Sequence, residues 1–415
     1  MDYFDLNLEL SKEDISIKMA AREFARKVMR PISIELDKMP AEEAFASGSP
    51  FWEFMKKAYE LDFHKILIPE YYGGEGLSPL QTHLVYEEFG WASFGLAVEL
   101  YVTAMPFVLM VMNGDENLID TFVRPFCECR DASMTGCWAI TEPEHGSDHV
   151  APAEEFFSTE VCKGNVQARL DGDEWVINGQ KSSWVSGATV ATHAVLHAQI
   201  DPSKGFAGNG VFIVPLDRKG ISKGKPLEKI GQRDLNQGEL FFDNVRIPKE
   251  WIMVDPDFYI PMFDIILSYP NMCMATWATG LARAAYEECL TYTKQRVQGG
   301  TLLKNHYSMK QRIFKQFART ESNRMISRKV MDANFNISPP HVEYAIVAKT
   351  TCCENAYQNA HDAIQIWGGN GLTKEYIVEK LFRDARATLI EDGNNECLEA
   401  HGGHVVYETY PRRPE

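Results

Sequence analysis

The sequence predicts an α+β multidomain protein, with a helical domain at each end of the chain and a β domain between them. Its 415 residues are enough for two or three hydrophobic cores. Apolar residues recur at helical spacing in the first and last thirds, whereas β-branched and aromatic runs separated by turns fill the middle. We therefore expect an N-terminal helical domain over residues 1–134, a central β-barrel domain over 135–255 and a C-terminal four-helix bundle over 256–415.

The first third has the pattern of amphipathic helices. Ser11, which is followed closely by acidic residues, is a typical N-cap for the first of them. A loop rich in Gly and Pro is expected over residues 69–76. The apolar spacing predicts helices over residues 11–45, 51–61, 78–90 and 96–113.

The middle third is predicted to form a β-barrel or a β-sandwich. On turn chemistry alone, Asn178-Gly179 predicts a hairpin turn, because both residues tolerate the left-handed conformation that tight hairpins need. Candidate strands occupy residues 174–179, 188–198, 211–215 and 238–243.

The last third returns to helical spacing. Gly299-Gly300 and Ser338-Pro339 are natural breaks between helices. The connections are short, so we expect an antiparallel bundle whose helices span residues 275–296, 308–333, 340–366 and 374–390.

Charge and composition exclude several classes of function. A net charge of −16 argues against nucleic-acid binding through general electrostatics and against adsorption to an anionic membrane. The nine cysteines lack metal-ligand spacing, so we expect reduced thiols and no metal site. We see no signal or transit peptide and no apolar run of the ~18–20 residues that a membrane span requires. The expected protein is cytoplasmic, with no membrane insertion.

The stretch over residues 363–395 carries the strongest functional signal. Gly368-Gly369 forms a glycine-rich turn, Arg383-Asp384 lies on a helical run, and Glu391-Asp392 follows on a turn that ends the run near Gly393. This order resembles the C-terminal signature of the acyl-CoA dehydrogenases, in which a Q-x-x-G-G-x-G turn and an R-D-A-R run lead to I-Y-E-G-T. The Glu of that motif is often the catalytic base. Its position here is taken by Asp392.

Two further motifs resemble the same family. Residues 137–148 contain Thr-Glu-Pro and Gly-Ser-Asp in the order of the family's flavin motif. The resemblance assigns Ile140 and Thr141 to the flavin pyrimidine edge, and Ser147 to the pantetheine or the flavin. Residues 175–187 resemble W-x-I-N-G-x-K-x-W-I-T-N-G, with one extra residue before the second Trp.

That second motif assigns Trp184 to stacking near the flavin and Ser186 to a hydrogen bond with flavin N5. Without the resemblance, Trp184 would be interpreted as a core residue of a strand. The resemblance also implies that FAD is shared between subunits. Arg296 would reach the FAD pyrophosphate of a partner subunit, and the same site would be completed by Gln365, Gly368 and Gly369. A shared site implies at least a homodimer. By analogy with the family, we expect a dimer of dimers, which is a homotetramer.

The position of the catalytic base is where this sequence departs most from the family's motif. Asp392 is one methylene shorter than Glu, so it reaches about 1.5 Å less far. Glu391 is an alternative base, and a polar turn without a chemical role is the other interpretation of the pair. The resemblance places Gly393 at the substrate and Asn394 at the cofactor. Glu99, an acid of the N-terminal domain, is a further candidate for substrate binding.

The resemblance implies an FAD-dependent acyl-CoA dehydrogenase that removes an α proton and passes a β hydride to FAD N5. An electron-transfer flavoprotein is the expected electron acceptor. Because Asp392, Asn271, Gly299 and His306 depart from the usual pattern, we expect a bulky, cyclic, aromatic-derived or polar acyl-CoA substrate. Two alternatives remain open, which are a flavin-dependent monooxygenase or desulfinase on the same fold and a non-catalytic flavin-binding relative.

Overall fold

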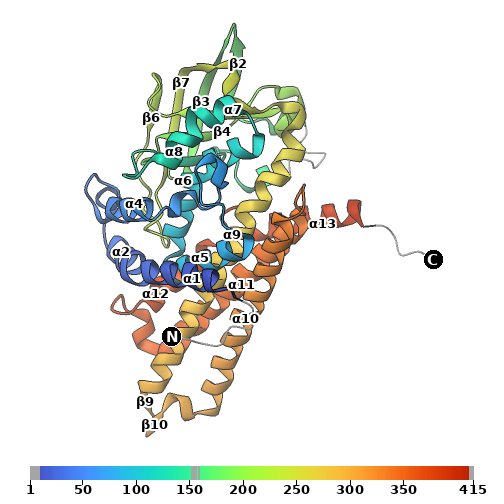
Figure 1. Ribbon diagram of the computed structural model, residues 1–415. Helices are drawn as coiled ribbons and strands as arrows, with labels where there is room; N and C mark the ends of the chain where they lie inside the picture. The colour runs from blue at the N-terminus through green and yellow to red at the C-terminus, as the bar shows by residue number, and fades with distance from the viewer. Residues whose placement is uncertain (1–9, 151–156, 158, 411–415) are drawn as a thin grey trace, which may run out of the picture.

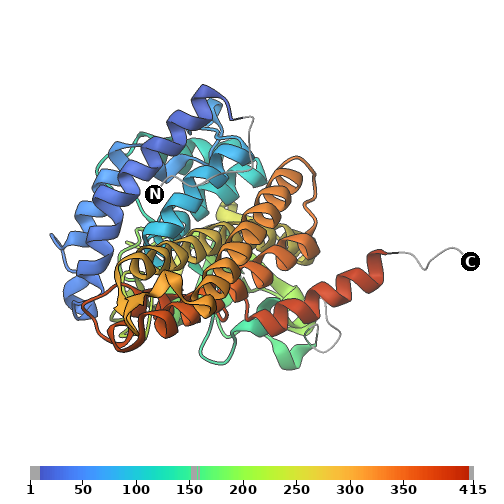
Figure 2. The same cartoon turned by 90° about the horizontal axis from the view of Figure 1, so that it is seen from below.

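The computed structural model describes residues 10–150, 157 and 159–410. The strands of its eight-stranded sheet gather at one end of the molecule, and the long helices of the last third extend to the other end, where a short two-stranded sheet lies (Figure 1). The N-terminal helices pack alongside the start of the bundle (Figure 2). One hydrophobic core runs through both helical regions, and a second fills the β region. The predicted order of a helical, a β and a helical domain is confirmed.

The N-terminal region consists of short helices around two longer ones. Ser11 begins the first helix with a capping box, because its hydroxyl accepts the Asp14 N–H at 3.0 Å and the Asp14 carboxylate accepts the Ser11 N–H at 2.9 Å. The predicted helix over 11–45 is divided by a π-helical turn at Ala25–Met29. The helices are α1 (Lys12–Phe24), α2 (Arg30–Leu36), α3 (Ala41–Ala44), α4 (Pro50–Glu60), α5 (Pro79–Ala92), α6 (Phe94–Asn113), α7 (Glu116–Leu118) and α8 (Arg124–Glu128).

Helix α6 corrects one expectation from the sequence. Within the described residues it is the one helix long and apolar enough to cross a membrane, with a mean hydropathy of 1.9 over its most apolar window. That window is 89% buried inside the protein. The apolar character therefore has an ordinary explanation, since α6 is a core helix enclosed by neighbouring elements.

The β region is one mixed sheet. Its hydrogen-bonded path runs β6-β7-β3-β2-β4-β5-β8, and β1 pairs with β4 in parallel. Among the described strands the path has two ends, β6 and β8, rather than the closed ring of the predicted barrel. The strands are β1 (Gly136–Ala139), β2 (Gln167–Asp171), β3 (Glu174–Ser186), β4 (His193–Gln199), β5 (Asn209–Pro215), β6 (Ile221–Lys223), β7 (Gln237–Pro248) and β8 (Ile252–Val254).

The predicted hairpin turn at Asn178-Gly179 is wrong. Strand β3 runs straight through these residues, and its pairing with β7 shifts register between Ile177 and Gly179. The Asn178 amide oxygen accepts the Asn244 N–H at 2.8 Å across this bulge. A Cβ on Gly179 would lie 2.8 Å from the Val166 Cα, so the glycine permits close packing rather than chain reversal.

The C-terminal region contains the four predicted helices and one more. Helix α9 begins at Tyr259, earlier than predicted, and continues through Pro270. The short strands β9 (Val297–Gln298) and β10 (Thr301–Leu302) enclose Gly299-Gly300. The helices are α9 (Tyr259–Gln295), α10 (Tyr307–Phe335), α11 (Val342–Trp367), α12 (Val378–Ala387) and the unpredicted α13 (Asn395–Thr409).

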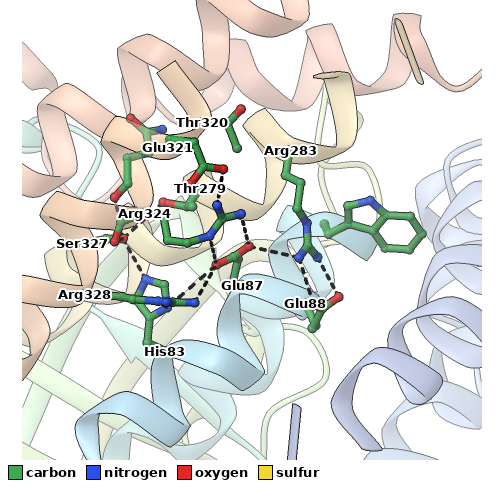
Figure 3. A network of polar contacts seen from close by, with 12 residues as sticks. His83, Glu87, Glu88, Thr279, Arg283, Thr320, Glu321, Arg324, Ser327 and Arg328 are labelled. Carbon is green, nitrogen blue, oxygen red and sulfur yellow. Dashed lines mark hydrogen bonds and ion pairs between the residues drawn. The ribbon is translucent and has the colours of Figure 1, made fainter. Parts of the chain in front are cut away.

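A buried ionic network joins α5 to α9 and α10 (Figure 3). Glu87 accepts hydrogen bonds from Arg283 at 3.0 Å and from Arg324 at 2.9 Å, while Glu88 pairs with Arg283 at 2.6 Å. Burial alone would raise the pKa of Glu87, but the guanidinium groups of Arg324 and Arg283 outweigh it and hold that pKa well below its usual value. The network, which we call the Glu87 network, fixes the N-terminal helices on the bundle.

Candidate active site

The acidic turn, residues 391–394, connects the end of the α12 segment to α13. Asp392 has a φ of +51° and Gly393 a φ of +93°, so two successive residues adopt left-handed conformations. Asp and Gly are among the residues that tolerate this conformation best. Asn394 then caps α13, because its side-chain oxygen accepts the N–H groups of Glu396 at 2.8 Å and Cys397 at 3.3 Å.

Side chains from separate elements hold this turn. The Ser147 hydroxyl, from the predicted flavin motif, accepts the Asn394 N–H at 3.0 Å. The Lys349 ammonium, from α11, donates to the Gly393 carbonyl at 2.8 Å. The acidic turn is therefore fixed from the β region on one side and from the bundle on the other.

The Asp392 side chain is half-buried, and its carboxylate is chemically available. Burial raises its pKa to about 6, and the ammonium of Lys349 opposes that rise. The described residues offer the carboxylate oxygens no hydrogen-bond donor in the observed geometry. A carboxylate with a pKa near neutrality and no competing donor is suited to taking a proton from a weak carbon acid.

Glu391 occupies a different environment from its neighbour. The Gln232 side-chain amide donates a hydrogen bond to the Glu391 carboxylate. Burial, followed by the negative charge of Asp392, raises the pKa of Glu391 to about 7. Glu391 is thus engaged with the β region.

Residues Ile140 and Thr141 follow β1 and are tied to β3. The Lys181 ammonium donates to the Ile140 carbonyl at 2.8 Å and to the Glu142 carboxylate at 2.8 Å. The Ser182 hydroxyl donates to the Thr141 hydroxyl at 3.1 Å. The loop that resembles the flavin motif is therefore held on the strand that carries the second motif.

Trp184 does not lie in the core. The pairing of β3 with β7 shifts register between Lys181 and Val185, where the sequence has its extra residue. Trp184 lies inside this irregularity and is 59% exposed, so its interpretation as a core residue is wrong. The Ser186 hydroxyl accepts a hydrogen bond from the Gln237 amide at 3.1 Å. An exposed indole beside strand-end hydroxyls fits a planar ring ligand such as a flavin.

The four residues assigned to a shared FAD gather at another corner of the chain. Arg296 caps the C-terminus of α9 and is exposed. Gln365 and Gly368-Gly369 are exposed at the end of α11, and a stacked Tyr292–Trp367 pair at 4.0 Å brings the two helix ends together. Helical rise separates this corner from Lys349 by about 24 Å along α11. A Cβ at Gly368 or Gly369 would meet no other atom within 4 Å.

Glu99 is not brought to the acidic turn. It lies in α6 with no exposed surface, and its carboxylate accepts the Asn236 N–H at 3.0 Å. The Asn236 carbonyl in turn accepts the Gly187 N–H at 2.7 Å, next to Ser186. Burial raises the pKa of Glu99 to about 8, so the side chain is predominantly a neutral acid at pH 7. The structure places Glu99 beneath the strand end that carries Ser186.

Sequence reasoning missed three residues that shape the acidic turn. Lys349 stood in no motif that would have singled it out, and Gln232 received no functional assignment. Asn271 was noted only as a departure from the family's arginine, yet its amide nitrogen lies 3.5 Å from the Asp392 carbonyl. The Asn271 side-chain oxygen is buried and has no partner among the described residues. No group of three or more His, Cys, Asp or Glu side chains within the described residues is arranged to hold a metal ion.

Three family models match consecutive parts of the chain. The N-terminal domain of acyl-CoA dehydrogenase matches residues 11–130, the middle domain 137–245 and the C-terminal domain 266–405. The short-chain specific mitochondrial acyl-CoA dehydrogenase of Bos taurus is 29% identical over 96% of this chain and 92% of its own length.

Two further relatives cover nearly the whole chain. Cyclohex-1-ene-1-carbonyl-CoA dehydrogenase of Geobacter metallireducens is 28% identical over 93% of this chain and 95% of its own length. A chain in a solved structure of the electron transferring flavoprotein of Acidaminococcus fermentans superimposes with a TM-score of 0.84 and 27% identity, covering 97% of this chain and 99% of that one.

Proposed function

We propose that Asp392 is the catalytic base of this chain, which belongs to the acyl-CoA dehydrogenase family and is an FAD-dependent oxidoreductase acting on acyl-CoA thioesters. One observation carries the proposal. Asp392 presents a half-buried carboxylate, with a pKa raised to about 6 and no hydrogen-bond donor among the described residues, on a turn fixed from two sides. Glu391, the alternative, already accepts a hydrogen bond from Gln232.

The residues present fit FAD. The exposed Trp184 offers a face for the ring system, and Thr141 and Ser186 offer hydroxyl groups beside it. FAD, when bound, supplies the two-electron acceptor for the β hydride of the substrate. We assign Ile140, Thr141, Trp184, Ser186 and, by its place on the turn, Asn394 to holding it.

The chemistry of the acidic turn follows from two groups on one residue. The Asp392 carboxylate takes the α proton, which is acidic only while the thioester carbonyl is polarised. The Asp392 backbone N–H makes no backbone hydrogen bond within the described part of the chain, so it is available to donate to that carbonyl. The left-handed conformation of Asp392 fixes both groups relative to each other.

We propose a cyclic, aromatic-derived or otherwise bulky or polar acyl group rather than a straight chain. The relative from Geobacter metallireducens acts on a cyclohexene carbonyl thioester, which supports a cyclic substrate. The unpaired, buried oxygen of Asn271 beside the turn supports a substrate with a hydrogen-bond donor, because such an oxygen gains most from a partner.

Anaerobic mixing of the purified flavoprotein with a panel of acyl-CoA thioesters tests both parts. Bleaching of the flavin by thioesters of cyclic or hydroxylated acids, and slower bleaching by butyryl- or octanoyl-CoA, is the expected result. A flavin that stays oxidised with every saturated thioester would contradict dehydrogenation and favour the monooxygenase or desulfinase alternative. The Asp392→Asn variant, which keeps the shape of the side chain, should leave the flavin oxidised with the best thioester.

We also propose an electron-transfer flavoprotein as electron acceptor and a dimer of dimers as the assembly. The similarity to a chain solved with an electron transferring flavoprotein supports the first. The separation of the Arg296 corner from the acidic turn supports the second, because a shared FAD would take residues from both places on different subunits. Reoxidation of the reduced enzyme by an electron-transfer flavoprotein tests the partner, and native mass spectrometry tests the assembly.

A further inference from the structure

Lys349 is an unusual residue for its position. It lies in α11 with no exposed surface, within a stripe of small buried residues on the same face of the helix: Ala345, Ala348, Cys352, Cys353 and Ala356. Burying an ammonium group is costly unless it is well hydrogen-bonded. A lysine in such a stripe therefore needs a compensating role.

The contacts of Lys349 all go to the acidic turn and the residue after it. Its ammonium donates to the Gly393 carbonyl at 2.8 Å and to the Asn395 side-chain oxygen at 2.7 Å. Both acceptors are neutral, and none of the ion pairs among the described residues includes Lys349. The positive charge of Lys349 is therefore not neutralised by a direct ion pair, and it acts on the nearby carboxylates of Glu391 and Asp392. Its two hydrogen bonds hold the backbone on the C-terminal side of Asp392.

We propose that Lys349 is the positioning residue of this reaction, which holds Asp392 in its left-handed conformation and keeps its carboxylate ionised. This inference rests on the proposed role of Asp392. It goes beyond that role because it assigns the geometry and the charge of the base to a residue that contacts neither the thioester nor the flavin.

The surroundings of Asp392 make Lys349 the decisive charge. Glu391 faces it from the same turn, Tyr101 from α6 and Cys273 from α9. Burial raises the pKa of Tyr101 and of Cys273 well above their usual values, so both are neutral over the working range. Among the residues that the structure describes, Lys349 is the one charge that lowers the pKa of Asp392. Its removal leaves burial unopposed.

Four variants, each studied as the FAD-loaded enzyme, separate charge from geometry. Lys349→Met removes both, Lys349→Arg keeps the charge, and Asn395→Ala removes one acceptor while keeping the charge. Lys65→Met is the matched control, because Lys65 is also buried but pairs with Asp62 at 3.0 Å in the N-terminal region. The readout is the rate of anaerobic flavin reduction by an acyl-CoA thioester between pH 5 and 9, with flavin absorbance and thermal unfolding as measures of folding.

Lys349→Met should slow reduction at pH 7 at least tenfold and move the acidic limb of the profile up by about one pH unit or more. Lys349→Arg should return the limb towards its original position, and Asn395→Ala should lower the rate without moving the limb. Lys65→Met should leave the profile in place. If Lys349→Met does not fold, Lys349→Arg and Asn395→Ala still test the proposal.

A uniformly lower rate with an unmoved limb in Lys349→Met, or an Asn395→Ala variant as fast as the natural enzyme, would overturn the inference. These outcomes are distinct from failure of the proposed function. If Asp392→Asn is as fast as the natural enzyme, Asp392 is not the base. If Asp392→Asn is inactive while Lys349→Met keeps its limb, only the role of Lys349 is wrong.

Discussion

Two carboxylate clusters, the half-buried acidic turn and the buried Glu87 network, are held in opposite ways. In the Glu87 network three arginines surround one glutamate, and the pKa of Glu87 lies well below its usual value. On the acidic turn two adjacent carboxylates share Lys349, Lys229 acts on Glu391 as well, and the pKa values of Asp392 and Glu391 still rise to about 6 and about 7. The negative charge of Glu87 is therefore balanced by nearby arginines, whereas the negative charges of the acidic turn are only partly balanced. Fully paired charges serve architecture, whereas underpaired charges can exchange protons near neutral pH.

The largest expected effect is the loss of the base. Asp392→Asn should lower the rate of anaerobic flavin reduction by about 10²- to 10⁴-fold, the usual contribution of a general base. Asparagine also tolerates a positive φ, so the turn should keep its shape. Stopped-flow measurement of flavin bleaching checks this, with unchanged flavin content and unfolding temperature as the control. A loss of less than tenfold would contradict the role of Asp392.

Breaking the Glu87 network should affect stability instead of chemistry. Arg324→Met removes two hydrogen bonds to Glu87 and leaves that charge undercompensated, which should cost ~3–5 kcal/mol of unfolding free energy. Denaturant unfolding followed by circular dichroism measures the loss. The matched control is Lys27→Met, which breaks an exposed helical ion pair with Glu23 and should change nothing measurable. Equal stability of Arg324→Met and the natural protein would show that the network is not what joins these helices.

The acidic turn and the Glu87 network should also respond to pH in different ranges. Because the base acts ionised and the pKa of Asp392 is about 6, the rate should fall about tenfold per pH unit below that value. The raised pKa means that Asp392 contributes stability in its protonated form, and this contribution is lost as pH rises from about 4 to 6.

Glu87 has the opposite sign. Its lowered pKa contributes stability above its unfolded value, and that contribution is lost only as pH falls to the lower folded value. Activity at pH 5 should therefore be about tenfold below its plateau while circular dichroism still reports a folded protein. Unfolding that coincides with the loss of activity would contradict this order.

The smallest effect distinguishes the two acids of the turn. Glu391→Gln should keep the rate within about threefold, because a glutamine oxygen can still accept the hydrogen bond from Gln232. Removing one of two like charges should move the acidic limb slightly downward. The pH profile of flavin reduction checks both points. A loss comparable to that of Asp392→Asn would make Glu391 the base.

Most of the architecture could be predicted from sequence, and the predictions that were wrong have physical causes. The N-cap at Ser11 and the helical spacing predicted helices that the structure contains, because these signals are local. The hairpin turn predicted at Asn178-Gly179 is wrong because these residues form an irregularity within β3. A tertiary contact, the close packing of Val166 against Gly179, decides this. Helix α13 was missed because Gly402-Gly403 lies inside it, where glycine normally weakens a helix.

In the candidate site, too, the residues in local motifs could be predicted, and those that depend on tertiary packing could not. Asp392, Ser147 and Trp184 stand in motifs, so the resemblance found them. Lys349 stands in a helix whose neighbours are small and apolar, and lysines are almost never fully buried unless paired. Its contact with the acidic turn depends on how α11 packs against the turn, which no spacing within either segment encodes.

The hydrogen bond from the Asn394 N–H to the Ser147 hydroxyl has a consequence for recombination between relatives. The contact joins the middle and last thirds of the gene product at one atom pair, and Gln232 adds a second point of attachment through Glu391. A chimera that exchanged the middle domain as a block would have to import a compatible serine and glutamine, or the donor's own acidic turn with them. The unit that can be exchanged is therefore a middle domain together with residues 391–394.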